Sequence, residues 1–403
     1  MIHEPAAGTK GAHTSSRLVR DAIDARVTAT QTPVSMSEPA PSSGPASSGS
    51  EQPLLQAALA LGQAARVAAY WSQYALSRRL TRPVRSRRPI AGEGPGLGYV
   101  LQDLRLLLRR DRDNVAAGLY RPPHDLLEAP LRALAGAPRY LRDLRQVERR
   151  RHARRHNEVS RPPPGSGPPR DLVGEGAYPK YYLQNFHYQT DGWLSAESAA
   201  LYDHQVEVLF VGGADAMRRQ ALVPLAGFLR ERRQAGLRLL DLGCGTGRLL
   251  SFVKDNWPRL PVTALDLSPA YLEAARRQLA PWRDTAFVQA PAEATGLPEA
   301  GFDMITAVYL FHELPARVRP QVLREVVRLL RPGGLFVLVD SLQKGDHPPY
   351  DPLLDYFSEA FHEPYHASYL KADLEGLLRR AGLVPEGLER AFFSRVMTAR
   401  RTV

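Results

Sequence analysis

A short glycine-rich stretch next to a carboxylate is the part of this sequence best suited to chemistry. Residues 239–248 read Leu-Leu-Asp-Leu-Gly-Cys-Gly-Thr-Gly-Arg, so an apolar run leads into three alternating glycines. Glycine has no Cβ atom and tolerates positive φ, which lets a ligand approach the backbone closely. Asp241 ends the apolar run, where its carboxylate can face a cationic or hydroxyl-bearing ligand. The pattern favours a small-molecule site around Gly243, Gly245 and Gly247.

A second carboxylate follows at the distance that a nucleotide site requires. Asp266 ends the next apolar run, in Thr263-Ala-Leu-Asp-Leu-Ser268, roughly 20 residues after the loop. An acid at that point of a βαβ unit can bind both hydroxyls of a ribose. The alternatives are local: Asp241 is then a turn residue, and Asp266 caps a helix that begins near Pro269. The two acids in one unit favour the ribose site.

A dinucleotide-dependent dehydrogenase is the closest alternative to consider. Its loop is Gly-x-Gly-x-x-Gly, in which the third glycine fits the helix against the sheet. Arg248 occupies that position here. The dinucleotide interpretation is therefore disfavoured.

These residues resemble class I S-adenosylmethionine-dependent methyltransferases, particularly those of ubiquinone and menaquinone biosynthesis. The resemblance covers residues 237–342 and includes Leu330-Arg-Pro-Gly-Gly-Leu-Phe336, similar to the turn into the fifth strand. It implies S-adenosyl-L-methionine as the cofactor. It also implies roles for individual residues: Asp241, Gly243, Gly245 and Gly247 under the methionyl part, Asp266 at the ribose, and Leu267 and the Ala292 backbone at the adenine.

The sequence departs from this family at one position. The segment Gln289-Ala-Pro-Ala-Glu293 normally offers an Asp or Asn to the adenine amino group, and Pro291 stands there instead. We therefore expect either weaker cofactor binding or an unusual contact from Gln289 or Glu293.

Candidates for acid–base or orienting roles follow the apolar runs. His312 and Glu313 come after the predicted fourth strand, where the acceptor of a methyl group normally lies, and either could act as a base or orient the substrate. A structural, hydrogen-bonded histidine is the alternative. Asp340, His362 and His366 are further candidates. We expect no metal site, because His312, His347, His362 and His366 have no ligand spacing.

An aromatic segment precedes the glycine loop. Residues 178–193 contain five tyrosines or phenylalanines before Trp193 itself. They could fold over the cofactor or line an apolar acceptor pocket, or could simply pack as an N-terminal cap. Together with residues 113–120, this segment is similar to uncharacterised methyltransferases of cyanobacteria and chloroplasts.

The elements that must position these residues alternate between apolar strands and helices. This rhythm predicts an α/β fold with a doubly wound, mostly parallel seven-stranded sheet of the Rossmann-like methyltransferase type, preceded by a helical N-terminal region. The predicted strands are 238–242, 262–267, 285–289, 304–310, 335–341, 384–393 and 395–403. The predicted helices are 54–80, 99–110, 125–134, 139–156, a stretch ending at Asp255, 270–279, 319–330 and 370–381.

Composition divides the chain into four parts. We predict a disordered tail (1–50), a basic helical region (51–160), a Pro/Gly linker (161–177) and the methyltransferase domain (178–403). Residues 1–170 carry a net charge of +13 and residues 171–403 carry −2, within a total of +11. The single cysteine, Cys244, excludes an internal disulfide.

The basic region leaves three functions open. The arginines from Arg139 to Arg155 are, in the simplest interpretation, a solvated helix face. With the apolar face of the same helix they also suit an anionic membrane surface, which would bring a small, lipophilic or aromatic, quinone-like substrate to the enzyme. A nucleic-acid methyltransferase tethered by these arginines is the alternative, but we do not expect it, because Val308-Tyr-Leu-Phe-His-Glu313 replaces the Asn/Asp-Pro-Pro-Tyr motif. The third possibility is a binding protein without turnover. We expect a cytoplasmic protein, either free or peripheral to a membrane.

Overall fold

The structure is a computed structural model that describes residues 51–81, 94–153, 167, 178–189, 192–232 and 236–402. The predicted tail and nearly all of the predicted linker lie outside these residues, as do Arg154 and Arg155.

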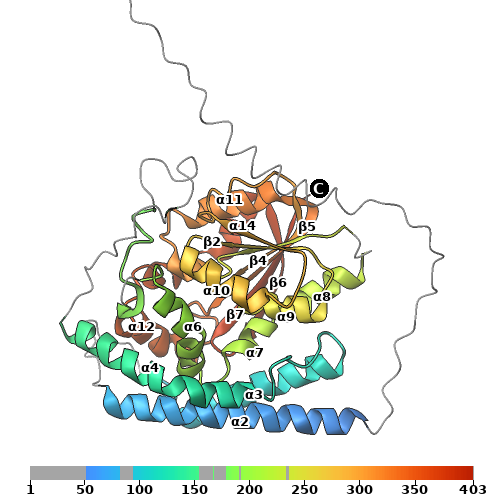
Figure 1. The fold of residues 1–403 in the computed structure, drawn as a ribbon. Coiled ribbons are helices and arrows are strands. Elements are labelled where there is room, and N and C mark those ends of the chain that lie inside the picture. Colours follow the sequence, from blue (N-terminus) through green and yellow to red (C-terminus); the bar gives the residue numbers. More distant parts are fainter. Residues whose placement is uncertain are drawn as a thin grey trace, which may run out of the picture.

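A seven-stranded sheet forms the centre of the molecule (Figure 1). The strand order is β3-β2-β1-β4-β5-β7-β6, and the first five strands are parallel, whereas β7 runs antiparallel to both β5 and β6. This arrangement confirms the predicted fold class. The strands are β1 (Leu239–Leu242), β2 (Val262–Asp266), β3 (Thr285–Gln289), β4 (Phe302–Val308), β5 (Leu330–Ser341), β6 (Leu383–Ala391) and β7 (Ser394–Arg401).

Helices cover both faces of the sheet. The α11 and α14 helices lie on one face, and α8, α9 and α10 lie on the other (Figure 1). All four residues of β1 are buried, as expected for a central parallel strand covered on both sides. These helices are α8 (Leu222–Arg230), α9 (Arg248–Asn256), α10 (Pro269–Leu279), α11 (Arg319–Leu329) and α14 (Leu374–Ala381).

Three long N-terminal helices form a further layer. They are α2 (Glu51–Leu80), α3 (Leu97–Ala116) and α4 (Ala129–His152). They lie together at the bottom of Figure 1. Buried leucines of α2 and α3 belong to the same hydrophobic cluster as β1 and β5. The basic helical region therefore packs directly on the part of the chain that contains the sheet.

Two helix predictions were wrong in their bounds. The α4 helix is continuous through Pro138, where two separate helices were predicted. Pro138 is exposed, so the carbonyl group that loses its hydrogen bond can be solvated. The α14 helix begins at Leu374 rather than at residue 370, because the Asp373 side chain accepts from the Gly376 N–H as an N-cap.

The chain from the aromatic segment to β1 contains several helical elements, and none of them was predicted. It comprises η2 (Phe186–Tyr188), α6 (Ala196–Leu209) and α7 (Ala214–Arg219), followed by α8. Four more short elements lie between β4 and α14: η3 (Phe311–Glu313), η4 (Pro348–Tyr350), α12 (Asp351–Ala360) and α13 (His366–Tyr369).

Buried ion pairs join the N-terminal layer to the rest of the fold. Arg66 of α2 lies 2.7 Å from Glu207 and 2.5 Å from Asp215, and Arg248 lies 2.5 Å from Asp215 and 2.6 Å from Asp125. Burial alone would raise the pKa of Asp215, but Arg248 and Arg66 hold it well below its usual range. These side chains come from α2, α6, α7, α9 and the loop before α4.

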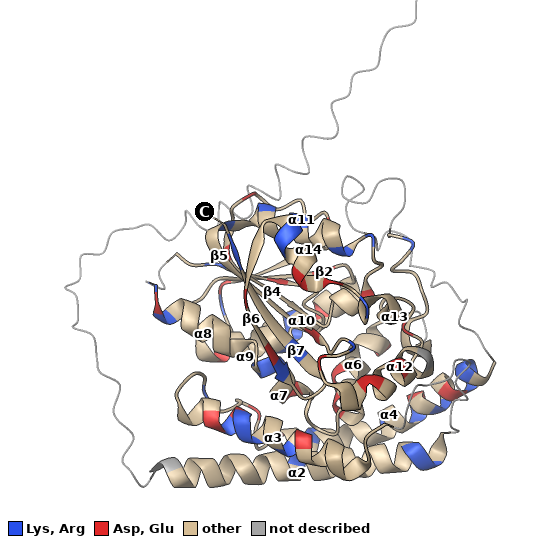
Figure 2. Cartoon of the chain, turned by 180° about the vertical axis from the view of Figure 1, so that it is seen from behind, with Lys and Arg blue, Asp and Glu red and all other residues tan. Residues whose placement is uncertain are grey.

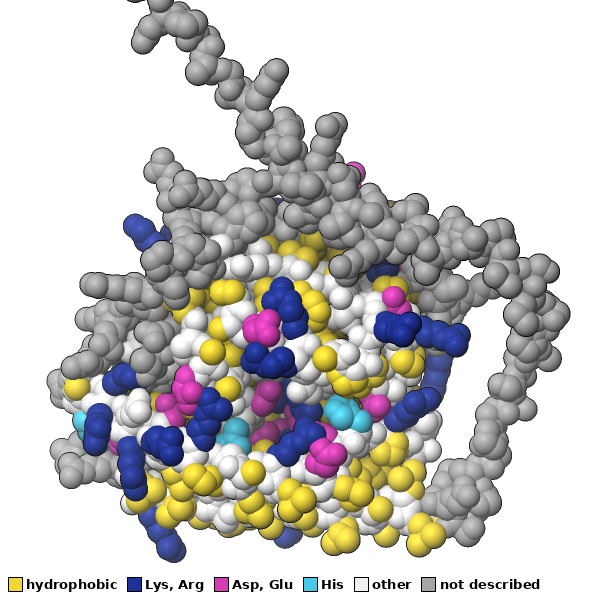
Figure 3. Space-filling view, viewed as in Figure 1, with side chains coloured by type: hydrophobic (Ala, Val, Ile, Leu, Met, Phe, Trp, Pro, Cys, Tyr) yellow, Lys and Arg dark blue, Asp and Glu magenta, His cyan; other side chains and the backbone are white. Residues whose placement is uncertain are grey.

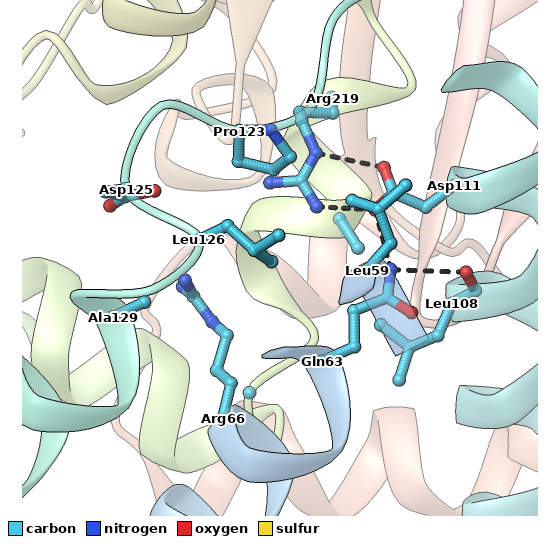
Figure 4. Close-up of a pocket in the computed structure, with 12 residues that line it drawn as sticks. Leu59, Gln63, Arg66, Leu108, Asp111, Pro123, Asp125, Leu126, Ala129 and Arg219 are labelled. Atoms are coloured by element: carbon cyan, nitrogen blue, oxygen red, sulfur yellow. Dashed lines mark hydrogen bonds and ion pairs between the residues drawn. The ribbon is translucent and has the colours of Figure 1, made fainter. Parts of the chain in front are cut away.

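A small cavity lies beside these ion pairs (Figure 4). Arg219 donates to Asp111 at 2.6 Å, and Gln63 of α2 donates to the same carboxylate at 2.9 Å. About 20 Å³ is open to the centre of a water molecule, which is room for roughly one water. This cavity is a packing feature and does not have the size of a ligand site.

We predict that Asp215→Ala destabilises the protein strongly. The substitution leaves three buried guanidinium groups without this carboxylate, because Arg66, Arg218 and Arg248 all pair with it. Breaking a buried pair from one side costs about 3–5 kcal/mol. Thermal unfolding should therefore shift down by roughly 10 °C. The control is Glu273→Ala, which removes an exposed pair with Arg277 and should shift the transition by little. Equal shifts would show that the buried pairs do not hold the layers together.

A helix must be both long and apolar to span a bilayer. Among the described residues, no helix is both long and apolar enough to span a membrane.

Candidate active site

A pocket opens at the carboxyl ends of the central strands, where ligands bind in doubly wound sheets. About 810 Å³ of space lies between its walls, including the open mouth. Its walls come from the glycine loop, the ends of β2, β3 and β4, and the aromatic segment before β1. The lining combines aromatic side chains, loop backbone and two carboxylates, and it includes Tyr181, Tyr182, Trp193, Tyr202, Gly243, Gly245, Asp266, Leu267, Tyr271, Pro291, Ala292, Tyr309, Leu310 and Glu313.

Two of the three loop glycines form the pocket wall. Gly243 and Gly245 have φ values of +68° and +54°, which other residues rarely adopt. A Cβ atom at Gly243 would lie 3.1 Å from a Leu310 methyl carbon, so a side chain there would crowd the loop. The backbone is therefore open to a ligand at these two positions, as predicted.

Gly247 does not line the pocket. A Cβ atom at this position would lie 3.2 Å from Ala275 and from Leu279 of α10, and φ is +78°. The third glycine therefore allows the start of α9 to pack closely against α10. Its predicted contact with the cofactor has no support in this geometry.

Asp266 lies on the pocket wall at the end of β2. Its two oxygens accept from the Gly245 N–H at 2.9 Å and from the Ser268 N–H at 2.8 Å. Burial raises the pKa of this carboxyl to about 6. Each carboxylate oxygen retains a lone pair, so the ionised group can still accept from two hydroxyls. This geometry fits the predicted contact with a ribose.

Asp241 lies behind the pocket wall rather than on it. The residue is 1% exposed, and it accepts from the Thr306 hydroxyl of β4 at 2.6 Å. Burial raises its pKa to about 7. Asp241 therefore connects β1 to β4 beneath the glycine loop. The structure does not bring it to the pocket beside Asp266, because its strand is central and fully buried.

Aromatic residues form the opposite wall, and only some of them were in the predicted segment. Trp193 packs edge-to-face against Tyr202 of α6 and Tyr271 of α10. Tyr181 donates to Glu293 at 2.6 Å, which fastens this wall to the loop after β3. Tyr202 and Tyr271 were missed, because each is one tyrosine on a helix and no sequence pattern distinguishes it from a core residue.

The predicted adenine region is apolar. Leu267, Pro291 and Ala292 line the pocket together. Gln289 donates to the Leu267 carbonyl at 3.2 Å, and Glu293 accepts from Tyr181. Both side chains that could replace the missing Asp or Asn therefore contact protein groups.

We predict that Pro291→Asp tightens binding of S-adenosylhomocysteine by roughly tenfold. The new carboxylate could accept from an adenine amino group, and hydrogen bonds to charged groups contribute about 1.5–3 kcal/mol before burial is subtracted. Calorimetric titration measures the change. Pro258→Asp is the control, because Pro258 is exposed in the loop between α9 and β2. Equal affinities for wild type and Pro291→Asp would contradict the prediction of weakened adenine binding.

The two predicted acid–base residues lie side by side after β4, but only Glu313 lines the pocket. His312 bonds through Nδ1 to Asp340 at 2.5 Å, and its Nε2 lies 3.5 Å from Glu313. Burial would lower the pKa of His312, but Asp340 and Glu313 raise it well above its usual value. The imidazole is therefore protonated at neutral pH and is not a free base.

Glu313 receives positive charge from two sides. His187, from the aromatic segment, lies 3.3 Å from it, and His312 lies on the other side. Burial would raise the pKa of Glu313, but these two imidazoles lower it to about 2. Its second oxygen, Oε2, is buried and has no hydrogen-bond partner among the described residues. The lone pairs of Oε2 are therefore unused by the described residues, and Glu313 itself lines the pocket.

Glu363 completes a cluster that the sequence did not indicate. It lies 3.7 Å from His187, and burial raises its pKa to about 7 despite His312 and His187. His187, Glu313 and Glu363 offer ligand atoms within 4.8 Å of one another, a geometry that could hold a metal ion. The pKa values of His187 and His312 are raised, so these imidazoles carry positive charge that balances the carboxylates. The four side chains therefore form a cluster of opposite charges.

The other histidine candidates have different surroundings. His366 is buried between the hydroxyls of Ser341 and Ser358, and burial lowers its pKa to about 3. His347 stacks on Tyr99 of α3, away from the pocket. Neither lines the pocket.

Backbone strain gathers around this site. His187, Tyr188, Tyr309 and His362 are non-glycine residues with φ between +51° and +56°. Such conformations cost energy and persist where the surrounding structure fixes them, often at functional sites. Tyr309 is fixed by its hydroxyl contact with Ser394 at 2.9 Å.

Comparison with known proteins places this geometry in a family. Residues 239–334 match the family described as "Methyltransferase domain". A malonyl-[acyl-carrier protein] O-methyltransferase of a Paenibacillus species is 32% identical over 173 residues, covering 41% of this chain and 58% of that protein. A demethylmenaquinone methyltransferase of Thermus thermophilus is 33% identical over 148 residues, covering 36% and 64%. An uncharacterised methyltransferase of Synechocystis sp. is 29% identical over 178 residues, covering 44% and 78%.

The sheet order, the glycine loop and this match define the class of protein. The chain carries a class I S-adenosylmethionine-dependent methyltransferase domain. It spans about three fifths of the length of the first two relatives.

Proposed function

We propose that this protein transfers the methyl group of S-adenosylmethionine to a small acceptor that is apolar or aromatic and quinone-like. The observation that carries the proposal is one pocket with two unlike walls. Gly243, Gly245 and Asp266 form a polar wall of backbone and carboxylate, whereas Trp193, Tyr202 and other aromatic residues form the facing wall. The menaquinone-related relative supports the same acceptor class.

The residues on the polar wall suit the parts of the cofactor. Asp266 would accept from the ribose hydroxyls, Leu267 and Ala292 would contact the adenine, and the backbone at Gly243 and Gly245 would lie against the methionyl part. The cofactor supplies a sulfonium methyl group that is already activated for transfer. The protein therefore needs mainly to hold the acceptor atom in line, and such alignment can contribute up to about 7–11 kcal/mol.

Glu313 is the residue we assign to the acceptor. Its unpartnered Oε2 would accept a hydrogen bond from an O–H or N–H of the acceptor and so orient that atom. His312 and His187 keep the carboxylate ionised and in place. His312 is therefore a positioning residue, held in turn by Asp340. The acceptor's proton would be drawn towards Glu313 as the new bond to the methyl carbon forms.

Transfer of a labelled methyl group tests the proposal. The full chain is incubated with methyl-labelled S-adenosylmethionine and a cell extract that has been separated into lipid, small polar and nucleic-acid fractions. We expect label in an apolar product that carries an aromatic or quinone ring. Label confined to nucleic acid would support the tethered nucleic-acid enzyme instead. No transfer to any fraction by protein that binds S-adenosylhomocysteine would contradict turnover.

A further inference from the structure

The outer face of the N-terminal helices is apolar over an unusual length. Between Glu51 and Arg78, the only charged side chain of α2 is Arg66, which points inward to Glu207 and Asp215. At 1.5 Å per residue this stretch, whose solvent side carries no charged residue, is about 40 Å long. Figure 2 shows α2 almost entirely without charged residues along its length, whereas α3 and α4 carry several. A helix on the surface of a water-soluble fold normally carries charged residues on its solvent side.

Large side chains project from this face into solvent. Leu54 and Leu61 of α2 are each 73% exposed, with alanines between them, and Leu131 of α4 is 69% exposed. Figure 3 shows hydrophobic side chains gathered along the lower edge of the molecule, over α2. We define the apolar face by its exposed leucines, which are Leu54, Leu61, Leu76, Leu127, Leu131 and Leu134. An exposed patch of this kind indicates a surface that another molecule covers.

The two helices that form the face run side by side in the same direction. Gln73 of α2 donates to the Ala133 carbonyl of α4 at 2.9 Å. Nearer the start of α2, a Cβ atom at Gly62 would collide with Leu126, which lies just before α4. Tyr70 of α2 and Tyr140 of α4 also belong to one buried cluster. The C-terminal ends of α2 and α4 therefore lie at the same end of the face.

Exposed arginines lie at the C-terminal ends of α2 and α4. We define the basic end as the exposed residues Arg78, Arg79, Arg142, Arg145 and Arg149. None of them forms an ion pair with a carboxylate in the described part of the chain. By contrast, the acidic side chains of α4 and its start are engaged: Glu128 pairs with Arg132, and Glu148 pairs with Arg151. Arg142 is near enough to Glu197 to help lower the pKa of that carboxyl. The whole surface therefore combines an apolar stretch with an excess of exposed positive charge.

We propose that the apolar face and the basic end together dock on an anionic lipid bilayer, with α2 and α4 lying in the plane of the interface. Leucines would enter the acyl boundary while the arginines meet lipid phosphates, as in interfacial amphipathic helices. A second copy of the chain would present a second set of the same exposed arginines, which would repel the first set. Nucleic acid would satisfy the arginines but give the leucines no apolar partner.

The α4 helix, which carries part of the basic end, also contacts segments that contribute residues to the pocket. Arg150 donates to the Tyr188 carbonyl at 3.0 Å, and Asp143 accepts from Gln205 of α6 at 2.7 Å. The α6 helix carries Tyr202 of the aromatic wall. A bilayer on this surface would lie next to elements that enclose the acceptor. This link to the acceptor rests on the proposed function, whereas the docking itself rests on the surface alone.

Vesicle flotation of the full chain tests the docking. Vesicles of phosphatidylcholine alone are compared with vesicles that also contain phosphatidylglycerol. Wild type should bind the anionic vesicles and bind the neutral ones weakly, with the difference reduced by salt. The variant Leu54→Gln/Leu61→Gln/Leu131→Gln should lose at least tenfold in vesicle affinity (~0.8 kcal/mol is lost for each buried CH₂ that is withdrawn). The variant Arg142→Gln/Arg145→Gln/Arg149→Gln should lose roughly a hundredfold, since each charge contributes about fivefold.

Matched controls remove the same side chains elsewhere. Leu388→Gln changes an exposed leucine of β6, and Arg276→Gln/Arg277→Gln/Arg379→Gln changes exposed arginines of α10 and α14. Controls should float like wild type, and all variants should bind S-adenosylhomocysteine equally, which verifies folding. Failure of wild type to float, or flotation of both test variants like wild type, overturns the proposal. Dimerisation that the leucine variant abolishes, or binding to RNA but not to vesicles, also overturns it. Flotation without methyl transfer would overturn only the proposed function.

Discussion

The substitution Glu313→Gln should lower kcat by roughly 10²–10³, the range typical of positioned acid–base groups. Glutamine keeps the size of the side chain but removes the ionised Oε2 that would face the acceptor. It also leaves His187 and His312 without their shared carboxylate. Initial rates with labelled cofactor and a purified acceptor measure the effect.

Affinity for S-adenosylhomocysteine distinguishes this role from a structural one. Asp266 and the glycine loop do not touch Glu313, so we expect cofactor affinity within about threefold of wild type, roughly 0.6 kcal/mol. Glu375→Gln on the exposed side of α14 is the matched control and should leave the rate unchanged. If Glu313→Gln and Glu375→Gln transfer methyl groups at the same rate, Glu313 has no contact with the acceptor.

The substitution Asp266→Asn should weaken S-adenosylhomocysteine binding by roughly 10²-fold. The carboxylate is the one charged group that the pocket offers to a ribose near the glycine loop, and hydrogen bonds to charged groups contribute about 1.5–3 kcal/mol each. Asparagine also replaces one of the two oxygens that accept from Gly245 and Ser268. Equilibrium dialysis with labelled ligand measures the change. Asp284→Asn, at an exposed position before β3, is the control. An unchanged affinity would remove Asp266 from the cofactor site.

The pKa of Asp266 adds a pH dependence to this prediction. Burial raises this pKa to about 6, so the carboxyl becomes protonated as the pH falls through 6 and accepts less well. Cofactor affinity should therefore be full above pH 7 and fall below pH 6. Asp266→Asn should flatten the profile. Asp241, with a pKa of about 7, does not line the pocket, so Asp241→Asn should keep the fall in place. A fall that follows Asp241 instead would contradict the geometry described here.

The sheet was predictable because its strands are short, apolar and separated by helices. The strand at residues 285–289 was predicted at the bounds that the structure has, and the strand predicted at 238–242 differs from β1 by one residue. The position of Asp266 on the pocket wall was predictable for the same reason: the end of a buried strand lies at the ligand edge of a parallel sheet.

Positions that depend on tertiary packing were less predictable. Asp241 and Gly247 match the same motif as their neighbours, yet one is bonded to Thr306 and the other fits α9 against α10. Sequence spacing cannot separate a residue that faces the ligand from one that faces the core. Glu363 and His187 are 176 positions apart, and only the folded chain brings them beside Glu313.

The N-terminal layer shows a different limit. The charge count indicated arginines on the last part of this region, but the pattern of residues 54–80 does not tell which side of the helix packs on the protein. Only the position of Arg66, turned inward to Asp215, shows which side is left in solvent. The exposed fractions of the side chains, and not the sequence pattern, show which side of α2 is open to another molecule.

Calorimetric titration of the full chain with S-adenosylhomocysteine tests the central claim most directly. The protein should bind one equivalent, and S-adenosylmethionine should compete for the same site beside Gly243, Gly245 and Asp266. A well-folded protein that gives no heat and no competition with either ligand would contradict the assignment of this pocket.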